Sequence, residues 1–203
     1  MKVELHLHTS RYSACGTATP AELMEALIAA GYEAVFITEH DALWSPWELD
    51  QLQGEYPRIR IFPGVELSLP RGAFQHLLVL GTSDLQYLSM SDDPAAILDK
   101  ARRENCLTIL AHPFRWEEAS RMLGQGLRPD AIEYRTCNQD GAAAEQALQT
   151  ARQLSLPCVN TGDTHGLDFI GRFWIETPLG LRDAADIRGI VLDGAYRNCS
   201  RDP

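Results

Sequence analysis

The sequence is poor in cysteine and lysine and contains no long apolar run. Its five cysteines are an odd number, and no two of them stand in C-x-x-C spacing. This pattern argues against a disulfide framework or a structural zinc finger, so a reducing compartment is expected. No apolar run reaches the ~18 residues of a membrane span, and the N-terminal MKVELHLHT enters a strand pattern without the features of a signal peptide. We therefore expect a cytoplasmic protein that does not enter a membrane.

Basic residues are outnumbered by acidic ones. The chain has 18 lysines and arginines against 28 aspartates and glutamates, which gives a formal net charge of −10. A surface this acidic repels long nucleic acids, although bound cations would let it accept a small phosphorylated substrate. The dinucleotide motif G-x-G-x-x-G, the P-loop motif G-x-x-x-x-G-K-[ST] and the nucleophile motif G-x-S-x-G are absent. The sequence therefore disfavours the common nucleotide-binding folds and serine-dependent hydrolases.

Short apolar runs alternate with helical patterns along the whole chain, without linkers, repeats or low-complexity segments. Most runs are rich in Val, Ile and Leu, which is typical of strands buried on both faces. This alternation predicts one parallel α/β domain over residues 1–203, whose seven or so strand–helix units close as a barrel or form an open doubly wound sheet. The expected strands are residues 2–7, 34–38, 59–67, 76–80, 106–111, 131–134, 158–161 and 173–175.

Helix starts are clearly marked. The sequence TPAE at 19–22 is a capping box with proline at the first helical position. The pairs SP at 45–46 and DP at 93–94 repeat the pattern of a capping residue followed by proline. Two further helices are expected near residues 141–154 and 184–191. Strands and helices thus follow each other as the α/β prediction requires.

Most of the six histidines lie where a predicted strand ends. They occur in the segments HLHT, ITEH, LAHP and GDTH, whereas His76 begins the run HLLVL. The carboxyl ends of parallel strands share one face of an α/β fold, and sites are usually built there. The HLH segment at 6–8 places two imidazoles on the same side of a strand, and DTH at 163–165 offers a carboxylate and an imidazole with the same spacing.

One histidine at a strand end is more often a hydrogen-bonded loop residue than a metal ligand. Here, however, six histidines and two carboxylates converge on one face under the fold prediction. Glu66 follows another apolar run, and its two oxygens would allow it to bridge two metal ions. Because these residue types ligate divalent metals, the sequence predicts a pocket that holds two or three ions. The candidate ligands are His6, His8, His40, Glu66, His76, His112, Asp163 and His165.

Seven motifs, in order along the chain, resemble those of the polymerase and histidinol phosphatase (PHP) superfamily. They are HLHT at 6–9, ITEHD at 37–41, PGVE at 63–66, HLLVLG at 76–81, AHPFR at 111–115, IEYRTCN at 132–138 and TGDTHG at 161–166. The resemblance spans nearly the whole chain. It implies a distorted seven-stranded β/α barrel, similar to a TIM barrel, with a metal cluster, often trinuclear, at the C-terminal ends of the strands.

The resemblance also divides the ligands among the ions. It implies one ion on His6, His8, Glu66 and Asp163 and a second on Glu66, His76 and His112. A third would lie on His40 and His165, normally with an acidic or histidine partner from the first loop.

Two residues depart from the family pattern. Cys15 precedes Gly16 where family members often carry aspartate. A thiolate there would bind a soft metal such as zinc; alternatively, Cys15 is a small buried cysteine beside a weak or empty third site. Glu39 replaces the commoner aspartate before His40, and we expect it to support the ligands without binding metal.

The oxygen- and nitrogen-rich ligand set suits Zn²⁺, Mn²⁺, Fe²⁺ or Mg²⁺, and two such ions can clamp a phosphoryl group and activate water. We therefore predict a metal-dependent phosphoesterase, a hydrolase acting on a phosphomonoester of a small metabolite or nucleotide. Asp163 and His165 would assist proton transfer. Arg115 is preferred over Arg11 and Arg135 as a ligand of the phosphate.

Three other functions are considered. An exonuclease or phosphodiesterase on short nucleotides would use the same metals, and a PHP module could bind metal without catalysis. A metal-dependent C–N hydrolase of the amidohydrolase type also opens with H-x-H. That class typically bridges its metals with a carboxylated lysine, whereas Lys2 starts a strand and Lys100 lies in a helical pattern. The sequence does not specify the substrate or the oligomeric state.

Overall fold

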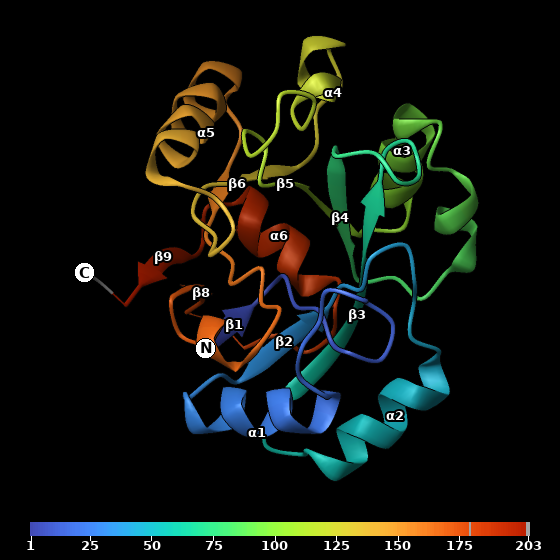
Figure 1. The fold of residues 1–203 in the computed structure, drawn as a ribbon, viewed down its shortest axis with the longest axis vertical. Coiled ribbons are helices and arrows are strands. Elements are labelled where there is room, and N and C mark those ends of the chain that lie inside the picture. Colours follow the sequence, from blue (N-terminus) through green and yellow to red (C-terminus); the bar gives the residue numbers. More distant parts are fainter. Residues whose placement is uncertain (179, 202–203) are drawn as a thin grey trace.

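The computed structural model describes residues 1–178 and 180–201, which form an α/β fold around one mixed sheet (Figure 1). Its strands are β1 (Lys2–Glu4), β2 (Ala34–Ile37), β3 (Arg60–Ser68), β4 (His76–Leu80), β5 (Leu107–Ala111), β6 (Ala131–Glu133), β7 (Cys158–Val159), β8 (Phe173–Glu176) and β9 (Arg197–Ser200). In the sheet they follow the order β7-β6-β5-β4-β3-β2-β1-β8-β9. All the predicted strands are present, and β9 was not predicted.

The sheet curls until it nearly closes into a barrel. At one end, the residues that follow β1 pair with those that follow β7. Leu7 and Thr164 form a parallel bridge, and the backbone N–H of His8 donates to the Thr164 carbonyl at 2.8 Å. Near the two edge strands, the backbone N–H of Asn160 donates to Oδ1 of Asn198 at 2.7 Å. The predicted distorted TIM-like barrel is therefore confirmed.

The sequence pattern predicted a parallel sheet, and this prediction is wrong, because the sheet is mixed. β4 runs antiparallel to β3 and β5, and β8 runs antiparallel to β1 and β9. The segment 69–75 between β3 and β4 is too short for the crossover that a parallel strand needs, which takes about a dozen residues. The reversal places His76, at the start of β4, opposite Ser68 and Ala111 at the ends of β3 and β5. His76 therefore joins the other histidines at one end of the barrel.

Helices cover the outside of the barrel. In Figure 1, α1 (Pro20–Ala29) and α2 (Pro46–Glu55) lie on one side, and α3 (Pro94–Arg103), α4 (Arg121–Gly124) and α5 (Gly141–Leu154) lie on the other. Short 3-10 turns occupy η1 (Leu85–Ser89) and η2 (Leu167–Phe169). The predicted caps are confirmed, since the side chains of Thr19, Ser45 and Asp93 each accept a backbone N–H at their helix start. Within the described ranges, no helix is long and apolar enough to cross a bilayer.

Alternate side chains of the central strands face two different cores. Phe36 of β2 and Leu78 of β4 point into the barrel. Their neighbours Val35 and Val79 pack outward, against the layer of α1 and α2 and that of α3, respectively. Burial on both faces explains why the strands read as continuous apolar runs.

The helix α6 (Asp186–Leu192) closes the end of the barrel opposite the histidines. Its residues Ile187 and Val191 belong to the inner core. Arg188 forms an ion pair at 2.9 Å with Asp130, which directly precedes β6. In Figure 1, α6 lies across the centre of the view between β2 and the pair β5 and β6. One end of the barrel is thus filled by apolar side chains, and polar groups gather at the other.

Candidate metal centre

All six histidines gather at the end of the barrel opposite α6. They are His6 and His8 in the extension of β1, His40 after β2, His76 at the start of β4, His112 after β5 and His165 after β7. His6 and His8 are fully buried. The side chains of His40 and His165 are 31% and 17% exposed, so they form the margin of the cluster that a substrate can reach.

Glu66, near the end of β3, lies among these rings and faces them with both oxygens. Its Oε1 lies 2.9 Å from Nδ1 of His76 and 3.0 Å from Nε2 of His112. Its Oε2 lies 3.0 Å from Nε2 of His8 and 3.0 Å from Nδ1 of His40. Each carboxylate oxygen therefore faces its own group of nitrogen donors, which is the arrangement needed to bridge two cations.

Asp163 approaches the cluster from the segment after β7. Its Oδ1 lies 3.3 Å from Nε2 of His6 and 3.6 Å from Nε2 of His8, and these two nitrogens are 2.9 Å apart. Asp163 is 1% exposed. Within the described part of the chain, neither of its oxygens, nor Oε2 of Glu66, accepts a directed hydrogen bond. Buried carboxylate oxygens without donors are costly, so these atoms mark places where a cation fits.

Hydrogen bonds on the outer side of the rings select which nitrogen remains free. Nδ1–H of His6 donates to Oε1 of Glu133 at 2.7 Å. Nδ1–H of His165 donates to the backbone carbonyl of Asp163 at 2.8 Å. These partners assign one proton to Nδ1, so Nε2 is the nitrogen of each ring that is left to bind a cation. Metal-binding histidines are commonly oriented by such outer partners.

Glu133 and Glu4 are buried carboxylates that the sequence analysis missed. Glu133 accepts hydrogen bonds from the backbone N–H of His112 and from the hydroxyl of Thr161, both at 2.6 Å. Glu4 accepts the backbone N–H of Gly162 at 2.8 Å. Both glutamates interrupt short apolar strands, and an acidic residue inside such a run is the signal that would have singled them out.

Glu39 has the supporting position that we expected. Its carboxylate accepts hydrogen bonds from the side chains of Thr9, Ser13 and Trp44. Ser13 in turn lies 3.2 Å from Nδ1 of His8. Glu39 therefore reaches the cluster through other residues rather than directly.

The clustered charges change the pKa values of one another. Burial disfavours the charged form of His6, but Asp163, Glu66 and Glu133 outweigh it and raise the pKa of His6 well above its ordinary value. Burial also opposes ionisation of Glu66 and Asp163, yet the histidines hold the pKa of both carboxyls well below their usual range. At the margin, burial lowers the pKa of His40 to about 4. A cation that enters the centre must therefore displace protons from the inner imidazoles.

Three groups of side chains at this end of the barrel can hold metal ions. In each group the ligand atoms lie within 4.8 Å of one another. The groups are His6, His8 and Asp163; His40, Glu66 and His76; and His8, Cys15, His40 and His165. His112 contacts Glu66, but among the described residues it falls outside these groups, whereas the family resemblance had placed it with Glu66 and His76.

The donor set and the backbone both fit a metal centre. Imidazole nitrogens and carboxylate oxygens are the ligands of Zn²⁺, Mn²⁺, Fe²⁺ and Mg²⁺ in proteins. Asp163 and His112 have positive φ angles of 44° and 27°, which are uncommon for residues other than glycine. Backbone strain of this kind concentrates at functional sites.

Arg115 lies at the mouth of the cluster. Its Nη1 is 4.0 Å from Oδ2 of Asp163, and its side chain is 35% exposed. The guanidinium lies over the ring of Trp116, 4.3 Å from the ring centre. Trp116 also meets the ring of His112 edge-on at 5.3 Å. Arg115 is thus held by an aromatic ring in a place where it can meet an anion bound at the cluster.

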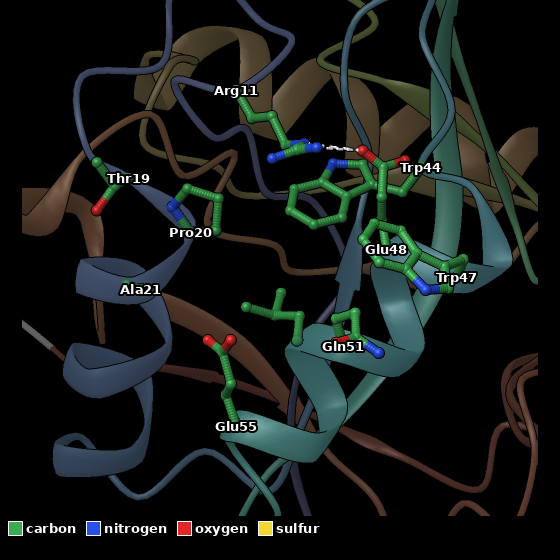
Figure 2. A pocket seen from close by; sticks show the side chains of 10 residues that line it. Arg11, Thr19, Pro20, Ala21, Trp44, Trp47, Glu48, Gln51 and Glu55 are labelled. Carbon is green, nitrogen blue, oxygen red and sulfur yellow. Dashed lines mark hydrogen bonds and ion pairs between the residues drawn. The ribbon is translucent and has the colours of Figure 1, made fainter.

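Arg11 and Arg135 are engaged elsewhere. Figure 2 shows Arg11 directed at Glu48, with which it forms an ion pair. The pair lines a cavity of about 430 Å³ whose other walls come from the start of α1 and from α2. Trp44 lines the same cavity and donates its indole N–H to Glu39 at 3.0 Å. Arg135 lies over Tyr134, 5.2 Å from the ring centre.

Comparison of the sequence with family models and with curated proteins finds no match. The structure, in contrast, matches solved structures over nearly its whole length. A two-domain protein from Bacteroides vulgatus that contains a predicted PHP-like metal-dependent phosphoesterase aligns with 99% of this chain, at a TM-score of 0.75 and 19% identity. This chain spans 65% of that protein.

Two further structures have similar folds. A candidate metal-dependent phosphoesterase from Bifidobacterium adolescentis matches at a TM-score of 0.62 and 16% identity, over 94% of this chain and 95% of its own. An amidohydrolase from Chromobacterium violaceum, solved with sulfate and without metal, matches at 0.62 and 14%, over 82% and 88%. The chain therefore has the barrel fold of PHP-like metal-dependent phosphoesterases, as its motifs indicated, and an amidohydrolase shares this fold.

Proposed function

We propose that the protein is a metal-dependent phosphoesterase that hydrolyses a phosphomonoester of a small metabolite or nucleotide. The observation that carries this proposal is the carboxylate of Glu66, whose two oxygens face two groups of imidazoles. The unpaired buried oxygens of Asp163 add a second anchor for cations. The similarity of the fold to PHP-like phosphoesterases supports the same class of reaction.

Two sets of residues would hold the metal ions. The first set is His6, His8, Glu66 and Asp163, and the second is Glu66, His40, His76 and His112. Divalent ions bound there would supply positive charge to a phosphoryl group and increase the acidity of water. This charge also offsets the repulsion between an anionic substrate and a chain of net charge −10.

Two side chains would act on the substrate itself. The guanidinium of Arg115, steadied by Trp116, can bind two phosphate oxygens at once. His165 donates through Nδ1 to the carbonyl of Asp163, so its Nε2 is free either to exchange a proton with the substrate or to bind a cation at the margin of the cluster. His165 is partly exposed, which places this nitrogen where the leaving group of a substrate can reach it.

Removal and return of metal tests the proposal. Chelator-stripped protein should hydrolyse no compound in a panel of phosphomonoesters, and addition of Zn²⁺ or Mn²⁺ should restore activity. Asp163→Ala should stay inactive after metal is added. Asp50→Ala, which changes an exposed carboxylate on α2, should behave like the wild type. Hydrolysis that survives both chelation and Asp163→Ala would refute the proposal.

The same panel separates the alternative functions. An exonuclease or phosphodiesterase would cleave short oligonucleotides faster than phosphomonoesters. A C–N hydrolase is suggested by the amidohydrolase match, but Lys100 pairs with Asp84 at 2.6 Å and Lys2 lies over Tyr32. Neither lysine is placed to bridge metals, and Glu66 would take that position under this proposal. A metal-loaded sample that hydrolyses no ester or amide would favour a module that binds metal without catalysis.

A further inference from the structure

Cys15 brings a sulfur atom to the margin of the histidine cluster. Its Sγ and the ring nitrogens of His8, His40 and His165 all lie within 4.8 Å of one another, so the four atoms can reach one cation. Cys15 is exposed and is therefore not the small buried cysteine that the sequence left as an alternative. Four donors of thiolate and imidazole type are characteristic of tetrahedral zinc sites.

The loop that carries Cys15 is fixed in place. The backbone N–H of Thr17 donates to the carbonyl of His165 at 2.7 Å. Gly16 lies so close to Thr9 that a Cβ added to it would be 2.4 Å from the Thr9 carbonyl carbon. Only glycine fits there without a shift of the backbone. Cys15 is therefore held between the extension of β1 and His165 before any ion binds.

The group around Cys15 differs from its two neighbours in its donor chemistry. Each neighbouring group includes a carboxylate, whereas this group combines one thiol with three imidazoles. His8 and His40 are shared with the neighbouring groups. Among the groups that the described residues form, Cys15 and His165 belong to this one alone. Thiolate and imidazole select zinc and similar ions, whereas carboxylates also suit Mn²⁺ and Mg²⁺.

We propose that Cys15, His40 and His165, with His8 at their shared edge, form a thiolate-ligated zinc site. The inference deepens the proposed function, because this site would be one part of the same metal centre. The centre is then chemically mixed, with a soft position at its exposed margin and oxygen-rich positions around Glu66. Zinc at the margin would also tie the loop of residues 9–18 to the segment of His165.

Cobalt titration tests this site directly, because a bond between thiolate and Co²⁺ absorbs in the near ultraviolet and nitrogen or oxygen ligands do not produce that band. Chelator-stripped full-length protein titrated with Co²⁺ alone should develop the band, and Zn²⁺ should remove it. Cys15→Ser should lose the band and one equivalent of tightly held zinc. Cys137→Ser is the matched control, since the Cys137 thiol contacts the carbonyl of Phe169 at 3.7 Å, and it should keep both.

Several outcomes would contradict the proposal that Cys15 binds metal. One is that the wild-type protein binds Co²⁺ without the band, and another is that the band persists in Cys15→Ser. Cys15→Asp keeps an anionic ligand, so this second variant should bind metal without the band and shift its preference from Zn²⁺ towards Mn²⁺. An unchanged zinc preference in Cys15→Asp would also contradict the inference. Phosphatase assays on the same samples separate the two proposals: a band without activity removes only the proposed function, and activity without a band removes only the thiolate site.

Discussion

Glu66 and Glu133 are both fully buried, and both contact His6. Their hydrogen bonds, however, are different. Glu133 accepts one N–H or O–H from each of three partners, among them the backbone of His112 and the hydroxyl of Thr161. Oε2 of Glu66 lies about 3 Å from several imidazole nitrogens but accepts no directed hydrogen bond from the described residues. Burial alone therefore does not reveal the role of a carboxylate.

Glu4 and Asp163 repeat the same contrast. Oε1 of Glu4 accepts the backbone N–H groups of Leu5, His6 and Gly162 at 3.0, 3.1 and 2.8 Å. Both oxygens of Asp163 lack such donors in the part of the chain that the structure describes. Hydrogen bonds offset part of the cost of burying a carboxylate, whereas buried carboxylate oxygens without donors favour a bound cation. Changing a carboxylate of each kind to the isosteric amide tests whether the two kinds have different roles.

The largest effect is expected for Glu66→Gln. The amide keeps the shape but loses the charge that would bridge two cations, so activity should fall by more than about 100-fold, the upper range for changes that only support metal ligands. Thermal unfolding should show that the variant has also lost its stabilisation by metal. Metal at 100 times its Kd should raise the free energy of unfolding of the wild-type protein by about 2.7 kcal/mol and that of the variant by much less. A Glu66→Gln protein that metal still stabilises fully would show that Glu66 is structural.

Glu133→Gln should show the opposite pattern. Its amide N–H₂ would face buried donors, so one of the hydrogen bonds from His112, Thr161 or His6 is lost. Leaving a buried donor unpaired costs about 1–3 kcal/mol, and this loss should appear in chelator, without metal. Urea unfolding of stripped protein measures it. Equal stability of Glu133→Gln and the wild type in chelator would mean that the hydrogen-bond distinction has no energetic weight.

Part of this centre could be predicted from the sequence because of a simple rule of geometry. Parallel strands place their carboxyl ends together, so His8, His40 and His112 were expected at one face. His76 lies at the start of its strand and reaches that face only because β4 runs antiparallel to its neighbours. That reversal follows from the short connection before β4, which is visible in the sequence.

The supporting residues were harder to predict, because their partners are far away in the sequence. Glu133 acts through His6 and Thr161, and Glu4 acts through Gly162, contacts that only the closed barrel creates. Cys15 was undecided for the same reason. Its position depends on the hydrogen bond from Thr17 to His165, which joins residues at opposite ends of the chain. Motifs locate ligands, but the side chains that orient them depend on the fold.

The smallest effect is expected for Glu48, a carboxylate that has three partner residues, as Glu133 does, but lines the cavity of Figure 2 with its side chain 13% exposed. It accepts hydrogen bonds from the hydroxyl of Tyr12 at 2.6 Å and from the hydroxyl and backbone N–H of Ser45 at 2.7 and 2.9 Å. These bonds, together with Arg11, lower the pKa of Glu48 from 4.5 to about 2.

Because of this lowered pKa, the carboxylate of Glu48 binds a proton less readily in the folded state than in the unfolded chain. The stabilisation is complete above pH 4.5 and is lost as the pH falls towards 2. Glu48→Gln should lower the free energy of unfolding at pH 7 by less than about 1 kcal/mol, because solvent screens its ion pair with Arg11, whose side chain is 45% exposed, and the difference from the wild type should shrink at pH 3. Urea unfolding of stripped protein at both pH values measures this. A difference that is the same at pH 7 and pH 3 would show that the charge of Glu48 has no part in it, and a difference as large as that of Glu133→Gln would show that burial adds nothing to the value of a satisfied carboxylate.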